Sequence, residues 1–157
     1  MPRILHLHNG HPHLRLDRSG IAKAIQLLDE HSDDFRGGCP KGELSLAFLT
    51  DEALAKIHGD FLDDPSKTDV ITFEGDPTHG VAGEICVSVD TAAQFAKEHN
   101  QNFSDELTLY VVHGWLHLAG FDDLQPKKKR EMRAAEKKAF KILSNAKRLP
   151  KFLLKRQ

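Results

Sequence analysis

Residues 104–123 read SDELTLYVVHGWLHLAGFDD, and this stretch does most to decide the fold. Apolar side chains occur on nearly every side of the helix that it predicts, so we expect this helix to run buried through the core. Ser104 is the expected N-cap, and the two acids that follow it suit the positive end of the helix dipole. Gly120 is expected to end the helix, because glycine tolerates the left-handed conformation of a C-terminal cap.

Two histidines of this helix indicate a metal site. His113 and His117 lie four residues apart, about 40° around the helix axis and one turn along it, so both imidazoles can reach one ion. After the turn at Gly120, either Asp122 or Asp123 can return as a third ligand. Such a set is typical of a catalytic zinc site with one position left open for water. The alternative is a helix whose histidines only form hydrogen bonds, but burying two of them without partners is costly.

The spacing has something in common with the metzincin proteases, whose signature is H-E-x-x-H-x-x-G-x-x-H. In those enzymes the glutamate after the first histidine is the general base. Here Gly114 occupies that position, so the side chain needed to deprotonate water for peptide hydrolysis is absent. The difference counts against a metalloprotease, which remains the third of three candidate functions.

The same residues resemble more closely the YbeY family of bacterial single-strand endoribonucleases and ribosomal RNA maturation factors. The motif of that family reads H-G-x-L-H-L-x-G-[YF]-D-H, and the chain matches it from His113 to Asp122. Asp123 stands where the family usually has a third histidine. A carboxylate binds zinc at about the same distance as an imidazole, but its negative charge should weaken the metal as a Lewis acid. We therefore expect a retained site with an altered metal preference.

Two further blocks extend the resemblance to about residues 43–140. The family's T-D-V-[LI]-[ST]-F segment corresponds to residues 68–73, and its G-[DE]-I segment corresponds to residues 83–85. Leu62, however, stands where the family commonly has an arginine that is thought to meet the RNA phosphate. Lys56 and Lys67 are the nearest cations that could replace it.

The resemblance implies metal-assisted hydrolysis of RNA phosphodiesters, with one zinc ion per chain held by His113, His117 and Asp123. Asp122 or Glu84 would steer the attacking water, or Asp122 would accept a hydrogen bond from a ligating imidazole. The implied partners are single-stranded ribosomal RNA and proteins of the small ribosomal subunit, in ribosomal RNA maturation and ribosome quality control. No DNA or membrane partner is expected. The main alternative is a ribosome-assembly factor whose metal is structural.

Charge is distributed unevenly along the chain. The net charge is -1, yet the segment from Pro126 to the end holds 13 Lys or Arg and only two acids, Glu131 and Glu136. Such a basic segment indicates a surface for nucleic acid or the ribosome, although a solvated helix face would look the same. The expected substrate-binding residues, besides Lys56 and Lys67, are Lys127, Lys128, Lys129 and Arg130.

Composition and length predict one domain in the cytoplasm. A chain of 157 residues with 39% hydrophobic and 29% charged residues is long enough to bury a core. Cys39 and Cys86 form no C-x-x-C unit, which suits a reducing compartment. No signal-peptide pattern or membrane span is apparent.

We predict an α+β domain with about four strands in a mixed sheet, packed with about five helices, and with the metal site on a buried central helix. Alternating or β-branched segments predict strands at residues 3–9, 44–48, 69–73 and 84–89. We place the endoribonuclease domain at residues 1–146 and expect residues 147–157 to be a basic, flexible tail. The N-terminal histidines are expected to face solvent: His6, His8, His11 and His13.

Overall fold

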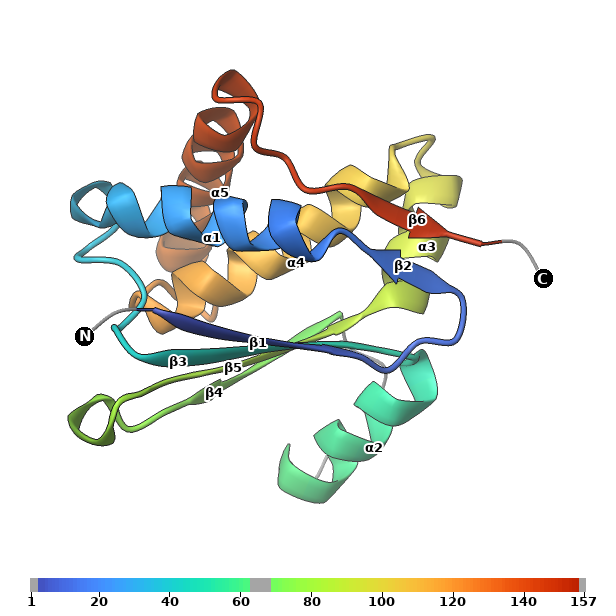
Figure 1. Ribbon diagram of the computed structural model, residues 1–157, viewed down its shortest axis with the longest axis horizontal. Helices are drawn as coiled ribbons and strands as arrows, with labels where there is room; N and C mark the ends of the chain where they lie inside the picture. Colours follow the sequence, from blue (N-terminus) through green and yellow to red (C-terminus); the bar gives the residue numbers. More distant parts are fainter. Residues whose placement is uncertain (1–2, 63–68, 156–157) are drawn as a thin grey trace.

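The computed structural model describes residues 3–62 and 69–155, and it shows an α+β domain (Figure 1). Its main sheet has four strands in the order β1-β3-β5-β4. The first three are parallel, and β4 runs antiparallel to β5, so the sheet is mixed as predicted. The strands of this sheet are β1 (Ile4–Asn9), β3 (Glu43–Leu49), β4 (Val70–Glu74) and β5 (Val81–Ser88).

Within residues 3–62 and 69–155, five α-helices pack around this sheet, which agrees with the predicted number. Helices α1, α4 and α5 lie over one face of the sheet, and α2 lies below the other face (Figure 1). Two short 3₁₀ helices, Ser32–Asp34 and Pro77–His79, stand in the loops. The α-helices are α1 (Arg18–Glu30), α2 (Asp51–Leu62), α3 (Val89–Glu98), α4 (Phe103–Leu118) and α5 (Pro126–Asn145).

Helix α4 is the buried central helix that the sequence predicts. Trp115 and Leu116 are fully buried in the main core cluster. Gly114 lies so close to the sheet that a Cβ atom there would come within 2.4 Å of Ile85 on β5. Any larger residue at this position would push the helix away from the sheet, so Gly114 allows the close packing that fixes the height of α4 above β5.

The two faces of β5 belong to two different clusters. Ile85 and Val87 pack in the main core beneath α4, whereas Cys86 packs with Leu54 of α2 in a smaller cluster. This division follows from the two-residue period of a strand, in which successive side chains point to opposite faces. It determines which residues of β5 can reach each helix.

The start of α4 differs from the prediction. Its N-cap is Asn102, whose side chain accepts a hydrogen bond from the backbone of Asp105. Ser104 lies in the first turn, and its hydroxyl donates to the carbonyl of Pro150 and accepts from the backbone N–H of Phe152. Ser104 is therefore not free to cap the helix, because it holds the C-terminal segment in place.

The C-terminal segment is a second correction. We expected a flexible tail from residue 147, but strand β6 (Phe152–Leu154) pairs antiparallel with β2 (Leu14–Leu16) in a separate two-stranded sheet. Phe152 is buried and contacts the ring of Phe48, with 5.4 Å between centroids. Burial of this aromatic ring and the β2 ladder keep the segment on the domain, so the boundary at residue 146 does not hold for residues 147–155.

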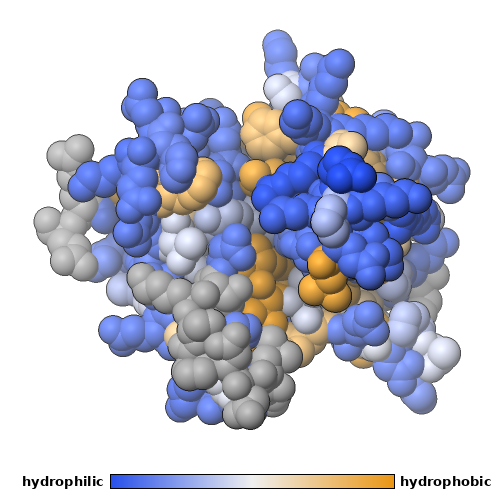
Figure 2. Space-filling view, turned by 180° about the vertical axis from the view of Figure 1, so that it is seen from behind, coloured by the Kyte–Doolittle hydropathy of each residue, from blue (hydrophilic) through white to orange (hydrophobic). Residues whose placement is uncertain are grey.

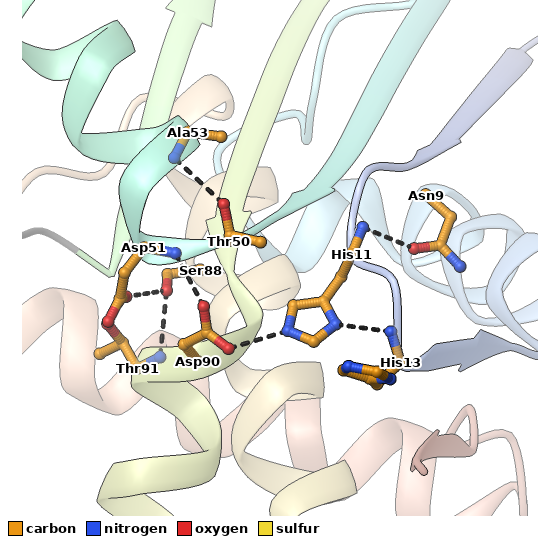
Figure 3. A network of polar contacts seen from close by, with 9 residues as sticks. All are labelled: Asn9, His11, His13, Thr50, Asp51, Ala53, Ser88, Asp90 and Thr91. Carbon is orange, nitrogen blue, oxygen red and sulfur yellow. Dashed lines mark hydrogen bonds and ion pairs between the residues drawn. The ribbon is translucent and has the colours of Figure 1, made fainter. Parts of the chain in front are cut away.

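One N-terminal histidine is a third correction. His6 and His8 are exposed as expected, but His11 is buried with only 8% of its surface accessible. Its Nε2 lies 2.8 Å from Asp90 at the start of α3, and its Nδ1 accepts the backbone N–H of His13 (Figure 3). The turn sequence of residues 9–12 predicts exposure here, but the loop after β1 turns inward to the carboxylate.

The Asp90 carboxylate also joins this loop to α2. Its second oxygen accepts the backbone N–H of Asp51, and Asp51 in turn accepts hydrogen bonds from Ser88 and Thr91 (Figure 3). The network thus lies where β1, β3 and β5 all end. Among the helices described, none has the length and apolar character needed to cross a membrane.

Candidate metal centre

The end of α4 brings the predicted metal ligands together. The helix stops at Ala119, and Gly120 follows with φ of +105°, the conformation that favours glycine. The backbone N–H of Gly120 donates to His117, and that of Phe121 donates to Leu116. This pair of bonds is the Schellman motif, and it turns the chain back over the last turn of the helix. Asp123 is thereby returned to the two histidines, as the sequence predicts.

The arginine of a distant loop holds this turn. Arg36 donates to the carbonyl of Gly120 at 3.1 Å, and its guanidinium lies 4.3 Å from the centroid of the Phe121 ring. It also pairs with Glu131 of α5 at 2.7 Å. Arg36 therefore ties the turn to α5, and sequence inspection gave no signal for it.

Three side chains converge at this end of the helix. Nε2 of His113 and Nε2 of His117 each lie 3.7 Å from an oxygen of Asp123. One ligand atom from each residue lies within 4.8 Å of the other two. The imidazole rings are 5.2 Å apart between centroids. Their side chains are between 21% and 38% exposed, so the site is partly open to solvent.

This donor set fits a divalent metal ion. Two ligands bound at about 2.1 Å in tetrahedral geometry lie about 3.4 Å apart, which is close to the two distances of 3.7 Å. Two imidazoles and one carboxylate are also a ligand combination found in catalytic zinc sites, where the fourth position is left to water. His113, His117 and Asp123 therefore form a candidate metal site.

A fourth residue, Glu136, was not predicted. Its Oε2 lies 2.6 Å from Nδ1 of His113, and its side chain is only 5% exposed. The signal in the sequence was weak but present: Glu136 occupies the buried face of α5, between the apolar residues Ala135 and Ala139. An acid on such a face needs a buried partner.

The surroundings of His113 favour its protonated form. Burial by itself lowers the pKa of an imidazole, but the hydrogen bond and charge of Glu136, together with the charge of Asp123, more than offset this. The net result is a pKa for His113 above its ordinary value. A metal ion must therefore compete with a proton for this ligand.

Asp122 points toward α5. One carboxylate oxygen accepts the backbone N–H of Leu124, and the other lies 3.3 Å from Nζ of Lys128. Desolvation raises the pKa of Asp122. The two hydrogen bonds and the charges of Lys128 and His117 lower it by more, so the net result is a pKa below the ordinary value of an aspartate. The alternative role expected for Asp122 was to accept a hydrogen bond from a ligating imidazole. At His113 the acceptor is Glu136 and not Asp122.

Glu84 is not brought to the site. It neighbours Cys86 on the same face of β5, and the Cys86 thiol donates to its carboxylate at 3.3 Å. That face packs toward α2, whereas α4 covers the face that carries Ile85. The sheet lies between Glu84 and the metal ligands, because strand residues alternate between faces. The direct catalytic role expected for Glu84 is therefore withdrawn.

The predicted cations lie in two places. Lys127, Lys128, Lys129 and Arg130 form the exposed first turns of α5, directly after the loop that carries Asp123. Figure 2 shows a strongly hydrophilic surface over this part of the molecule. Lys56 is exposed on α2, below the other face of the sheet. Lys67 and the side chain of Leu62 lie outside the described residues.

Position 114 also bears on the protease alternative. In the metzincin pattern this position carries the catalytic glutamate. Here Gly114 is packed against Ile85, and even a Cβ atom would come within 2.4 Å of that side chain. The backbone at this turn of α4 has no room for a glutamate side chain, so the fold itself disfavours a metzincin arrangement.

Comparison with known proteins identifies the relatives of this chain. The family model described as "Endoribonuclease YbeY" matches residues 7–144. A protein named endoribonuclease YbeY from Porphyromonas gingivalis is 39% identical over 108 residues, covering 69% of this chain and 72% of the relative. Another of that name from Salinibacter ruber is 33% identical over 144 residues, covering 86% and 88%.

A solved structure supports the same fold. The solution structure of TM1509 from Thermotoga maritima superposes with a TM-score of 0.62 and covers 92% of both chains. Its sequence identity of 24% is low, so this similarity speaks for the fold alone. The solved structure agrees with the α+β architecture, and the range matched by the family model includes the motif on α4.

Proposed function

Because the chain belongs to the YbeY endoribonuclease family, we propose that it is a zinc-dependent enzyme that cuts single-stranded RNA in ribosomal RNA maturation and ribosome quality control. The observation that carries the proposal is the convergence of His113, His117 and Asp123 on a solvent-facing point beside a basic helix. Convergence provides the ligands, and the exposure of the donors leaves room for a phosphodiester.

Zinc is the proposed ion because two imidazoles and one carboxylate suit it and leave one position open. When bound, it would polarise a phosphate oxygen and lower the pKa of its water toward about 7. Asp123 contributes a negative charge that a third histidine would not, so other divalent ions remain candidates for the same ligands.

The remaining chemistry is assigned to residues beside the ligands. Asp122 lies next to Asp123 and is half-exposed, so we propose that its carboxylate orients the attacking water by accepting one of its protons in a hydrogen bond. Lys128, which pairs with Asp122 at 3.3 Å, would hold the carboxylate in place and add positive charge beside the scissile phosphate.

RNA would lie along the first turns of α5. Lys127, Lys129 and Arg130 are exposed there, and within the described part of the chain no ion pair is found for any of them. Phosphate contacts of this kind give affinity without sequence preference and weaken as salt rises. Lys56, on the far side of the sheet, would contact only RNA that wraps around the domain, and Lys67 remains a proposed contact from the sequence alone.

Ribosomal RNA and proteins of the small ribosomal subunit are the proposed partners, in the cytoplasm. The second candidate function is a ribosome-assembly factor in which the metal is structural. Asp123 and Leu62, the two departures from the family pattern, favour it. A structural zinc usually has four protein ligands, whereas three converge here in the described residues, and for this reason we favour the enzyme.

The test is cleavage of a single-stranded ribosomal RNA fragment by the purified protein. His117→Ala and a chelator-treated sample serve as controls, and zinc content is measured in each preparation. Cutting by the untreated protein alone is the expected result. A zinc-loaded protein that leaves the RNA intact would support the assembly-factor function, and equal cutting by all samples would indicate a contaminating nuclease.

A further inference from the structure

Helix α5 carries one acid on its buried face. The other residues of that face are apolar, and Glu136 is as buried as they are, at 4% exposure. Burying a carboxylate is costly unless hydrogen bonds or charges compensate for it. Its partners are Nδ1 of His113 at 2.6 Å and Nη1 of Arg133 at 3.4 Å. The apolar residues of the face are Met132, Ala135, Ala139 and Leu143.

We propose that Glu136 is a positioning residue for the metal ligand His113. A carboxylate oxygen at 2.6 Å from Nδ1 accepts a hydrogen bond from that nitrogen, so the proton of the neutral ring stays on Nδ1. The neutral ring then carries its lone pair on Nε2, the atom that faces Asp123. Glu136 thus fixes both the tautomer and the rotation of the ring, as carboxylates behind ligating histidines generally do. This inference rests on the metal-binding function proposed above.

The charge of the site strengthens the argument. Asp123 and Glu136 each supply a negative charge, and two neutral imidazoles supply none. A divalent cation therefore neutralises the set, while a monovalent cation leaves an excess of negative charge. Arg133 approaches Glu136 from the solvent side, and its side chain is 63% exposed, so water screens its charge.

A purely structural role is the competing explanation, since the same hydrogen bond ties α5 to α4. The two roles differ in what they change. A structural tie affects the stability of the fold, whereas a positioning residue also affects the tautomer of His113 and the affinity for metal. Glu98 offers a control, because it is an exposed acid near the end of α3 and accepts a hydrogen bond from Gln94 of the same helix.

The experiment compares Glu136→Gln and Glu136→Ala with the parent protein and with Glu98→Gln. Circular dichroism establishes that each variant is folded; the glutamine keeps the size of the side chain, so it remains informative if the alanine variant unfolds. Zinc affinity is measured by competition with a chromophoric chelator. The tautomer of His113 is read from nitrogen-15 NMR of the metal-free protein at about pH 9, where imidazoles are neutral.

The expected result is a zinc affinity about 10-fold lower in Glu136→Gln and up to about 100-fold lower in Glu136→Ala, with Glu98→Gln unchanged. In the metal-free parent, Nδ1 of His113 should carry the proton, and this preference should be lost in Glu136→Ala. An unchanged tautomer in folded Glu136→Ala, or an unchanged zinc affinity in Glu136→Gln, would overturn the inference. If the parent binds no zinc but the tautomer shifts, positioning by Glu136 stands and the proposed metal function fails.

Discussion

Two histidines of this protein each face a buried or half-buried carboxylate, yet they lie in different kinds of site. His113 meets Glu136 at 2.6 Å at the end of α4, and His11 meets Asp90 at 2.8 Å at the start of α3. The difference lies in the second ring nitrogen. In His11 it accepts the backbone N–H of His13, whereas in His113 it faces the Asp123 carboxylate and solvent.

This comparison shows what makes a histidine–carboxylate pair useful for metal binding. A backbone N–H on the second nitrogen uses the lone pair that a metal would need, so His11 acts as a connector between three segments (Figure 3). A free lone pair beside a further histidine and carboxylate makes His113 a ligand. A histidine–carboxylate pair alone does not distinguish a metal ligand from a structural connector.

The strongest test of this difference removes one histidine from each region. We expect His117→Ala to lose bound zinc and to lower RNA cleavage at least about 100-fold, since two ligands remain of three. His11→Ala should keep its zinc and its cleavage rate, measured at a temperature where it stays folded. Loss of zinc in His11→Ala would mean that the two regions are coupled.

Asp90→Ala tests the connecting role of the second region. It leaves the buried Nε2–H of His11 and the backbone N–H of Asp51 without their acceptor. Each lost partner costs about 1–3 kcal/mol, so the free energy of unfolding measured in urea should fall by at least that amount. Glu98→Ala, at the exposed end of the same helix, should change it by less than about 0.5 kcal/mol. Equal effects would contradict the role assigned to Asp90.

Asp122→Asn separates binding from chemistry within the metal region. Asparagine keeps the size of the side chain but is neutral, so it pairs less well with Lys128 and orients water less strongly. We expect zinc content to stay the same while single-turnover cleavage slows about 10-fold, which is less than the loss of about 100-fold or more on full removal of a positioned catalytic group, because asparagine can still accept a hydrogen bond from water. An unchanged rate would leave Asp122 with the structural role of fixing the loop.

Asp123→His gives the smallest expected effect. It tests how an aspartate in place of a histidine changes the cleavage rate and the metal preference. A neutral third ligand should make bound zinc a stronger Lewis acid, so cleavage with zinc should rise by about threefold. Metal exchange followed by cleavage assays with zinc and manganese would show whether the preference also moves, since carboxylates suit manganese better than imidazoles do. A lower rate with zinc in the variant would show that Asp123 is adapted to its present site.

Sequence reasoning was most successful where the decisive contacts are local. His113, His117 and Asp123 are joined by one helix and one turn, so spacing and a glycine predicted that two histidines and an acid converge, and the resemblance to the YbeY family favoured Asp123 over Asp122. Glu136 could not be paired with His113 because the two lie on different helices, and nothing local states how these helices pack. Glu84 was misplaced for a related reason: alternation gives the two faces of a strand, but not which face a helix will cover.

The fold shows the same limit. Strands of five to eight residues with clear alternation were found, whereas β2 and β6 have three residues each and too little pattern to be recognised. His11 was expected in solvent because it lies in a turn sequence, residues 9–12, directly after the first strand. In both places a long-range partner, Phe152 or Asp90, decided the outcome.

The pairing of β2 with β6 also affects the order in which the elements fold. Leu16 aligns with Phe152, so most of the described chain lies between the two partners of this ladder. Closing so large a loop costs entropy that only a nearly complete core can offset. The four-stranded sheet and α4 are therefore expected to assemble first, and the small sheet is expected to close over them at the end of folding.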